Sequence, residues 1–298
     1  MPNSVVIIGD SPIPDRPSRD LVIYARDAGL NAMYIPISRI SVKVDKDGPL
    51  TVIRNRPFKV DGVFLRSLGV LIDVETFFRR TITMRLIEES GTVVINPLDG
   101  LLRTRNKLET TVILKSKGLP VPDTIGTEDI LYAYETAKSM KDVVIKPLQG
   151  SRGGYGAVKV SDADIAFQIM RTLLTFKKPI YLQKYIEKPN RDIRVMVIDG
   201  EVFGCMIRVA PSGQWKTNVA QGAVGKPCTN IDRTVMELAV KSVEALDLIY
   251  GGVDIGEGKD GYVIFEVNGS PDWAELTAVT GRNPAKALVL SMMRRLKA

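Results

Sequence analysis

The sequence predicts an α/β N-terminal domain with a mostly parallel sheet, followed by an α+β region built on antiparallel strand pairs. Over the first hundred residues, short runs rich in valine and isoleucine alternate with stretches whose apolar residues recur at helical spacing. In the second half, apolar runs come in pairs joined by turns such as Asp199-Gly200. Alternating strands and helices favour a parallel sheet, whereas paired runs favour hairpins.

The N-terminal domain is expected to alternate strand and helix. We predict strands at residues 4–9, 31–37, 60–67 and 92–97. We predict helices at residues 18–29, with Ser18 as N-cap and Gly29 at the end, and at residues 73–91, ending at Gly91. Residues 40–55 form a predicted hairpin around Asp47-Gly48, because Asp-Gly favours tight turns.

The pattern changes after Pro97. A helix is predicted at residues 105–118, ended by Gly118, and an extended linker at residues 119–124, because each proline there disfavours helical backbone in the preceding residue. We therefore predict one domain at about residues 1–98 and a second at about residues 99–298. The second domain divides into a subdomain at about residues 120–184 and a C-terminal subdomain at about residues 185–298.

The second domain contains a predicted strand, glycine-rich loop and strand over residues 143–160. A helix at residues 162–176 and a strand at residues 180–186 follow. The C-terminal part is then expected to hold hairpins at residues 192–210 and 250–271 and helices at residues 232–248 and 283–297.

Composition limits the class of protein. Of the 298 residues, 45% are hydrophobic and 25% are charged, as in soluble globular proteins. No apolar run approaches the ~20 residues of a membrane span and the N-terminus lacks the basic region of a signal peptide, so we expect a cytoplasmic protein without membrane contact. Cys205 and Cys228 are too few for a disulfide framework or a zinc cluster, and we expect both to be reduced.

Charge and the lack of histidine narrow the chemistry. The net charge of +7 suggests acidic partners, but the basic residues are dispersed, which favours a nucleotide or a small carboxylic acid over nucleic acid. A chain without histidine excludes Ser-His-Asp and Cys-His nucleophiles and histidine-based metal sites. Catalysis must therefore depend on carboxylates, lysine, arginine, backbone dipoles and hard metal ions.

The stretch "VVIKPLQGSRGGYGAVKV", residues 143–160, carries Lys146 next to four closely spaced glycines. Loop N–H groups and a neighbouring lysine can hold phosphate oxygens, and glycines allow close approach of the backbone. An ordinary hairpin with a long turn and a solvent-exposed lysine explains the stretch alone equally well. The stretch "GDSPIPD" after the first predicted strand lacks G-x-G-x-x-G, and G-x-x-x-x-G-K-[ST] occurs nowhere in the sequence, which disfavours a dinucleotide oxidoreductase or a P-loop enzyme.

Acidic residues cluster on the last predicted hairpin. Asp254 lies on its first strand, and Glu266 and Asn268, two residues apart, project from one face of its second strand. Two carboxylates and an amide oxygen suit Mg²⁺ held together with substrate phosphates. A solvated sheet face is the alternative. Arg194 and Arg208, on the preceding hairpin, could stabilise phosphate charge or form surface salt bridges worth roughly 0–1 kcal/mol.

Taken together and in order, these motifs resemble the ATP-grasp superfamily, and within it the RimK-like α-L-glutamate ligases. The resemblance covers roughly residues 100–290 and rests on "RNKLETTVILKSKGLPVPDT", "VVIKPLQGSRGGYGAVKV", "YLQKYIE", "RDIRVMVIDG", "GGVDI" and "EVNGSP". It implies an α/β N-terminal domain and α+β ATP-grasp domains, namely a glycine-loop lid subdomain and a C-terminal antiparallel-sheet subdomain.

The resemblance also implies roles for individual residues. Lys107 and Lys146 correspond to the lysines that contact ATP phosphates, and Arg194 and Arg208, with Lys146, to the catalytic cations. Metal ligands are implied at Asp254, Glu266 and Asn268, for Mg²⁺ or alternatively Mn²⁺. The remaining implied ATP contacts are Gly150, Ser151, Gly153, Gly154, Tyr155 and Gly156 in the lid loop, Gln183, Lys184, Tyr185 and Ile186 around adenine, and Glu187 and Asp192 at the ribose.

The implied activity joins a carboxylate to an amine through an acyl phosphate formed from ATP. The stretch "QWKTNVAQGAVG" departs from the branch that modifies ribosomal protein, and "EVNGSPDW" is closer to archaeal ligases that add L-glutamate to tetrahydromethanopterin or the deazaflavin coenzyme. The expected partners are therefore ATP, L-glutamate and an acidic acceptor, with a homo-oligomer, dimer or tetramer, as the assembly. Modification of a ribosomal protein C-terminus and a non-catalytic MgATP-binding regulator stay open as alternatives.

Overall fold

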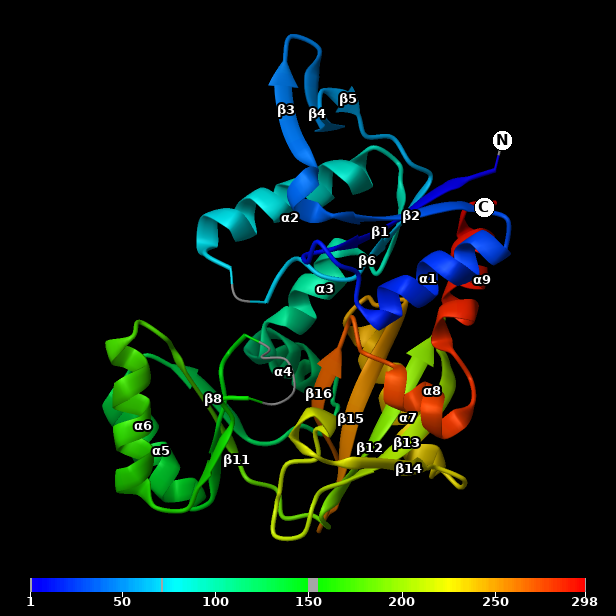
Figure 1. Cartoon of the computed structure of the whole chain (residues 1–298). Helices are drawn as coiled ribbons and strands as arrows, with labels where there is room; N and C mark the ends of the chain where they lie inside the picture. Colours follow the sequence, from blue (N-terminus) through cyan, green and yellow to red (C-terminus); the bar gives the residue numbers. More distant parts are fainter. Residues whose placement is uncertain (1, 71, 150–154, 298) are drawn as a thin grey trace.

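The computed structural model describes residues 2–70, 72–149 and 155–297. Four sheets make up these parts (Figure 1). A parallel sheet and a small antiparallel sheet lie at the top of the view, and two larger antiparallel-rich sheets lie below, one green and one yellow to orange. The predicted contacts Gly150, Ser151, Gly153 and Gly154 lie outside the described residues.

The N-terminal sheet has the order β2-β1-β6-β7 and all its neighbouring strands are parallel. Its strands are β1 (Ser4–Gly9), β2 (Asn31–Pro36), β6 (Gly62–Leu65) and β7 (Val93–Ile95), as predicted. Val5 and Ile7 pack toward α1 (Arg16–Asp27) and α9 (Pro284–Arg295), whereas Val6 and Ile8 pack toward α2 (Val74–Glu89). Both faces are buried, which explains the continuous apolar runs.

The start of α1 differs from the prediction. Asp15, not Ser18, caps this helix: the Asp15 carboxylate accepts a hydrogen bond from the Ser18 backbone N–H at 2.9 Å, and Pro17 lies in the first turn. Ser18 therefore lies one turn inside the helix and is buried. Gly29 and Gly91 follow their helices at φ of +85° and +84°, the left-handed conformation that ends a helix.

The predicted hairpin forms β3 (Ser41–Asp45) and β4 (Gly48–Ile53), joined by the short β5 (Arg56–Pro57) into an antiparallel sheet of its own. This sheet projects from the top of the molecule (Figure 1). A 3₁₀ turn, η1 (Ile37–Arg39), leads into it.

The helix predicted at residues 105–118 is α4 (Lys107–Ser116), and another helix, α3 (Leu98–Arg105), directly precedes it. Asn106 separates them because its extended backbone breaks the helix and its side chain accepts from the N–H groups of Leu108 and Glu109 at 3.2 and 3.3 Å. The sequence prediction missed α3. This break makes Lys107 the first residue of α4.

The green sheet has the order β10-β9-β11-β8, with β8 (Thr124–Thr127), β9 (Val143–Ile145), β10 (Val158–Val160) and β11 (Ile180–Lys184). Strands β9 and β10 pair in antiparallel register, Ile145 with Val158, so the described ends of the glycine-rich stretch form a hairpin. Helices α5 (Ile130–Met140) and α6 (Ala163–Thr175) cover its outer face (Figure 1). Strand β8 and α5 were not predicted.

The five-stranded antiparallel sheet has the order β14-β13-β12-β15-β16. Its strands are β12 (Arg191–Ile198), β13 (Glu201–Val209), β14 (Val224–Pro227), β15 (Tyr250–Gly258) and β16 (Gly261–Asn268). Helix α7 (Arg233–Ala245) packs on one face. The prediction missed β14, α8 (Ala274–Thr280) and the 3₁₀ turn η3 (Val219–Gln221).

One apolar cluster joins the first and last parts of the chain. It contains Val5 and Phe64 from the parallel sheet together with Tyr250, Trp273 and Met292 from the C-terminal region. The last helix thus completes the N-terminal layer, and the predicted division at residue 98 stays a prediction. No helix in the described residues has the length and apolar character to cross a membrane.

The two cysteines correct a prediction. Cys205 on β13 and Cys228 just after β14 form a disulfide, with their Cα atoms 5.6 Å apart. The small number of cysteines led us to expect that both are reduced. Antiparallel pairing of β13 with β14, however, brings these two positions, 23 residues apart in sequence, into contact.

Candidate active site

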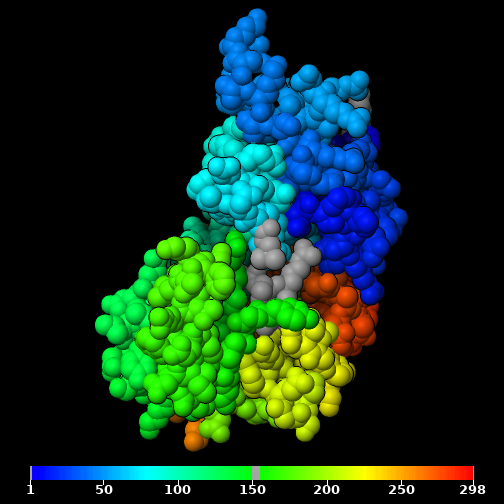
Figure 2. All heavy atoms as spheres, turned by 60° about the vertical axis from the view of Figure 1, so that its left-hand side comes forward, coloured from blue at the N-terminus to red at the C-terminus, as the bar shows by residue number. Residues whose placement is uncertain are grey.

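A pocket of about 880 Å³, counted to its open mouth, lies between the green sheet and the five-stranded sheet. Its size suits a nucleotide-sized ligand. In Figure 2 the segment after β13 (yellow) lies beside the part of the chain that contains the green sheet. Among the predicted site residues, those that line the pocket are Lys107, Lys146, Tyr155, Gln183, Lys184, Tyr185, Ile186, Asp192, Arg208, Asp254 and Glu266.

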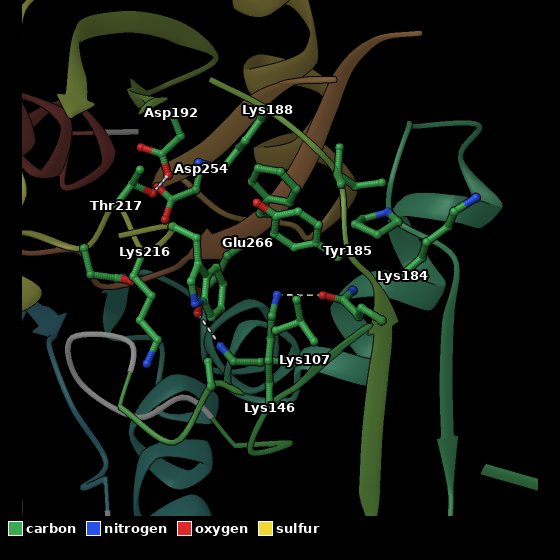
Figure 3. Close-up of a pocket in the computed structure, with 18 of the residues that line it drawn as sticks. Lys107, Lys146, Lys184, Tyr185, Lys188, Asp192, Lys216, Thr217, Asp254 and Glu266 are labelled. Atoms are coloured by element: carbon green, nitrogen blue, oxygen red, sulfur yellow. Dashed lines mark hydrogen bonds and ion pairs between the residues drawn. The ribbon is translucent and has the colours of Figure 1, made fainter. Parts of the chain in front are cut away.

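Lys107 and Glu266 form an ion pair on one wall of the pocket (Figure 3). Lys107 begins α4, directly after the Asn106 cap, and Glu266 lies on β16. Burial alone would raise the pKa of Glu266, but the charge and hydrogen bond of Lys107, with the charges of Lys146 and Arg194, lower it to about 2. Glu266 is therefore ionised at neutral pH.

Lys146 follows β9 and points into the pocket, where its ammonium group donates to the Gln183 side-chain oxygen at 2.6 Å (Figure 3). Gln183 in turn donates to the Thr124 hydroxyl at 2.9 Å, which fixes the amide. Burial, and then repulsion from Lys107, lower the pKa of Lys146 from 10.5 to about 8, although Glu266 and Asp254 oppose this shift. Two neighbouring lysine ammonium groups create a site that favours an anion.

Asp254 lies opposite Glu266, in register across β15 and β16. Both of its oxygens contact arginines: Arg194 pairs with it from β12, and Arg208 NH2 lies 2.9 Å from Asp254 Oδ2. Arg194 itself does not line the pocket. The predicted carboxylates and cations are thus brought together, with each carboxylate neutralised by a neighbouring cation.

Asp192 is buried and binds Arg208 through both oxygens, at 2.8 and 2.6 Å. Burial opposes the charge of Arg208, but Asp254 and Asp192 outweigh it and raise the pKa of this arginine. The Thr217 hydroxyl also donates to Asp192 (Figure 3). The role predicted for Asp192 at the ribose stays a prediction; in this structure the carboxylate orients Arg208.

A β-bulge decides which side chains of β16 face the pocket. Asp254 pairs with Glu266 but the next residue, Ile255, pairs with Ile264, so Phe265 is inserted as an extra residue. Phe265 and Glu266 consequently both line the pocket, whereas Ile264 and Val267 both face the core. Strict strand alternation excludes this arrangement, and the sequence analysis missed Phe265.

The sequence analysis also missed an aromatic and basic part of the wall. Trp215 packs edge-on against Tyr185, with ring centroids 6.2 Å apart, and Lys159 lies 3.7 Å from the Tyr185 ring centroid. Other missed lining residues include Lys188 and Thr217. Trp215 belongs to an irregular segment after β13, whose sequence has neither helical nor strand periodicity. A tryptophan between lysine and glutamine was the one feature of this segment that could have indicated a binding residue.

Besides Arg194, three of the predicted residues that the structure describes lie outside the pocket lining. Glu187 is exposed. Gly156 has φ of +80°, and a Cβ there would lie 2.7 Å from Pro147 Cγ, so the turn needs glycine at this position. Asn268 pairs with Gly252 and lines a neighbouring pocket.

The donor set fits a hard divalent cation. Asp254 and Glu266 are neighbouring carboxylates on paired strands, and Asn268 follows Glu266 by two residues on the same strand. Within the described residues no three acidic or cysteine side chains gather into a metal cluster. The two carboxylates therefore need additional oxygen ligands, as Mg²⁺ obtains from substrate phosphates and water.

Comparison with known proteins agrees with this architecture. A family model, the RimK-like ATP-grasp domain, matches residues 104–292. The chain is 33% identical over 284 residues to the tetrahydromethanopterin:alpha-L-glutamate ligase of Methanocaldococcus jannaschii, covering 93% of this chain and 94% of the relative. It is 37% identical over 217 residues to the alpha-aminoadipate–LysW ligase LysX of Saccharolobus solfataricus, covering 71% and 78%.

A solved structure of the ATP-grasp ligase PsnB with its minimal precursor superposes with a TM-score of 0.77 at 21% identity and covers 99% of both chains. This likeness confirms the predicted fold class, and the family match confirms the expected enzyme class, an ATP-dependent carboxylate–amine ligase. The chain belongs to the RimK-like ATP-grasp family.

Proposed function

We propose that this protein uses ATP and Mg²⁺ to attach L-glutamate to an acidic, coenzyme-like acceptor. The observation that carries the proposal is the convergence of Lys107, Lys146, Asp254 and Glu266 on one pocket. The sequence similarity to tetrahydromethanopterin:alpha-L-glutamate ligases over nearly the whole chain supports the choice of substrates. The roles below are part of the proposal.

The reaction has two steps. A carboxylate oxygen attacks the γ-phosphorus of ATP, the bond to the bridging oxygen breaks, and ADP leaves with the formation of an acyl phosphate. The amine nitrogen then attacks the acyl carbon, phosphate leaves, and the nitrogen loses a proton to give the amide. Catalysis of such steps depends mainly on positioning and charge stabilisation.

The acidic and basic residues have different roles in this reaction. Mg²⁺, or alternatively Mn²⁺, would be held by Asp254, Glu266 and Asn268, and supplies charge to neutralise phosphate oxygens. In this structure Lys107 neutralises Glu266, and Arg194 neutralises Asp254. With both carboxylates holding a metal ion, Lys107 and Arg194 would be available to bind phosphate oxygens, so their charges would be compensated with or without the metal.

Other side chains position the reacting groups. Lys146 contacts the phosphates, and the segment Gln183 to Ile186 contacts adenine beside the Trp215 ring. Asp192 and Thr217 hold Arg208 in a fixed orientation, which removes the entropic cost of ordering its long side chain during the reaction.

The test supplies the purified protein with MgATP, L-glutamate and tetrahydromethanopterin, and follows ADP release and product mass. We expect ADP release that depends on both substrates and a product heavier by one glutamyl residue. Absence of acceptor-stimulated ADP release, under conditions in which the Methanocaldococcus jannaschii ligase is active, would contradict the proposal. Tight MgATP binding without turnover would favour the non-catalytic regulator.

A second candidate deserves a parallel assay because of the 37% identity to an alpha-aminoadipate–LysW ligase. In that case the substrates are alpha-aminoadipate and LysW, and ADP release should respond to these two instead of to L-glutamate and the coenzyme. Modification of a ribosomal protein remains a prediction that mass spectrometry can test, and the homo-oligomer one that sedimentation of the same preparation can test. The cytoplasmic location stays a prediction.

A further inference from the structure

A second pocket lies beside the active site, between the parallel sheet and the five-stranded sheet. It has about 520 Å³ of empty space, counted to its mouth. Its walls come from the loop after β6, from α3 and from the loop after β16. The lining residues are Arg66, Ser67, Leu68, Leu101, Thr104, Arg105, Asn268, Gly269 and Ser270. Among the lining residues that the structure describes, the only formal charges are the two arginines.

Arg66 is a buried cation with weak charge compensation. It is 6% exposed, and it donates to the Tyr250 hydroxyl at 2.9 Å and to the Pro271 carbonyl at 3.0 Å, both neutral groups. The Asp15 carboxylate lies 4.0 Å away, at the limit of an ion pair. Its Nε has no hydrogen-bond partner among the described residues. Burial of the Arg66 charge among neutral groups costs free energy unless an anion binds beside it.

Arg105 brings a second positive charge to the same pocket. It donates to the carbonyl of Gly69, and, with the Gln149 amide turned to satisfy both groups, Nε and NH2 donate to the Gln149 oxygen at 2.7 and 2.8 Å. Burial lowers the pKa of Arg105, Asp10 opposes this, and the nearby Arg80 lowers it further. Its hydrogen-bond partners are thus mostly neutral oxygens, like those of Arg66.

The scaffold around Arg66 is rigid. Its guanidinium carbon lies 4.7 Å from the Trp273 ring centroid, and the Ser270 hydroxyl donates to the Arg66 carbonyl at 2.6 Å. These contacts join the loop after β6 to the loop after β16. The cation is therefore held in place before any ligand arrives, which lowers the cost of binding.

The second pocket is close to the proposed reaction centre. Asn268 lines it, and Asn268 lies two residues from Glu266 on β16, about 7 Å along the strand. A molecule bound by the arginines could thus extend toward the metal and phosphate groups. Arg66, Ser67 and Leu68 lie outside the residues matched by the family model, 104–292, so this wall is a feature of the N-terminal part of the chain.

We propose that the second pocket is a carboxylate-binding subsite in which Arg66, supported by Arg105, selects a substrate acid group for ligation. The ligand class is an aliphatic carboxylate, contributed either by L-glutamate or by the acidic acceptor. The inference rests on the proposed ligase function for the identity of these substrates. The site's affinity for a carboxylate does not depend on turnover and can be measured without it.

The first experiment measures binding by calorimetry in the presence of MgADP, with L-glutamate and glutarate as probes. The variants are Arg66→Gln and Arg105→Gln. Arg282→Gln is the matched control, because Arg282 also donates to a carbonyl and lies 4.5 Å from a phenylalanine ring but does not line this pocket. We expect Arg66→Gln to weaken carboxylate binding about 10- to 100-fold, with MgADP affinity unchanged within about twofold.

The second experiment measures KM for L-glutamate, acceptor and MgATP separately in the same variants. A rise in KM for one carboxylate substrate alone identifies which acid group occupies the subsite. A rise for MgATP with both carboxylate substrates unchanged would overturn the proposal, as would equal kinetics of Arg66→Gln and Arg282→Gln. If Arg66→Gln fails to fold, the same KM values are compared between Arg105→Gln and Arg282→Gln.

The two proposals fail in different ways. Carboxylate binding that depends on Arg66, without ADP release in any substrate mixture, would support the subsite and contradict the ligase. ADP release with substrate affinities independent of Arg66 and Arg105 would support the ligase and overturn the subsite.

Discussion

Lys146 allows the proposed phosphate site to be tested without knowledge of the acceptor. Its pKa is lowered from 10.5 to about 8, mainly by burial and then by Lys107. A bound triphosphate brings negative charge that favours the protonated lysine, so binding should return this pKa toward its usual range. Above about pH 8, nucleotide binding must therefore take up a proton.

The size of the effect follows from the two pKa values. With about 8 in the free protein and a value near 10.5 in the complex, MgATP affinity should fall about tenfold, or ~1.4 kcal/mol, between about pH 7 and pH 9. Calorimetry in buffers of different ionisation enthalpy should count close to one proton taken up at about pH 9. Lys146→Met should bind weakly and lose this pH dependence.

The matched control is Lys259→Met, which removes an exposed lysine from the turn between β15 and β16. It should keep the wild-type pH profile. A wild-type affinity that is constant from about pH 7 to pH 9, or an unchanged profile in Lys146→Met, would refute the assignment of Lys146 to the phosphates.

The same lysine should reduce stability in the absence of nucleotide. Because its folded-state pKa lies below the unfolded value of 10.5, the unfolded chain binds the proton more tightly, and wild-type stability should rise as pH increases from about 8 to 10.5. At neutral pH the shift corresponds to ~3 kcal/mol, from which the lost hydrogen bond to Gln183 subtracts about 1 kcal/mol. Lys146→Met should therefore unfold at a higher temperature than wild type.

Three further predictions use other parts of the site. Glu266→Gln should raise the Mg²⁺ concentration required for turnover about tenfold or more, and an unchanged metal titration would contradict its role as ligand. Gly256→Ala would place a Cβ against the Phe265 ring, so we expect weaker nucleotide binding with little loss of stability; unchanged affinity would show that the ring does not form part of the binding wall. The double variant Cys205→Ser, Cys228→Ser should lose about 3 kcal/mol of stability from its 23-residue loop, and equal melting of wild type and variant under oxidising conditions would refute this.

Much of the fold was predictable because its signals are local. The apolar run of β1 and the Asp199-Gly200 turn between β12 and β13 specify their structure through residues close in sequence. The missed elements lack such signals. Strand β14 has only four residues, and its Val224 is exposed, whereas α3 has only eight residues and ends at the Asn106 cap of the next helix.

The sequence by itself determined which chemistry is available: no histidine, two lysines and two arginines in recognisable motifs, and carboxylates on one hairpin. Only the tertiary structure decided how they meet. Three features depend on strands and loops that are distant in sequence. They are the bulge that directs Phe265 and Glu266 into the same pocket, the pairing of β13 with β14 that joins the cysteines, and the burial of Arg66 beside Trp273. The physical reason is that side-chain direction follows from strand register and burial, and both are set by long-range packing and not by neighbouring residues.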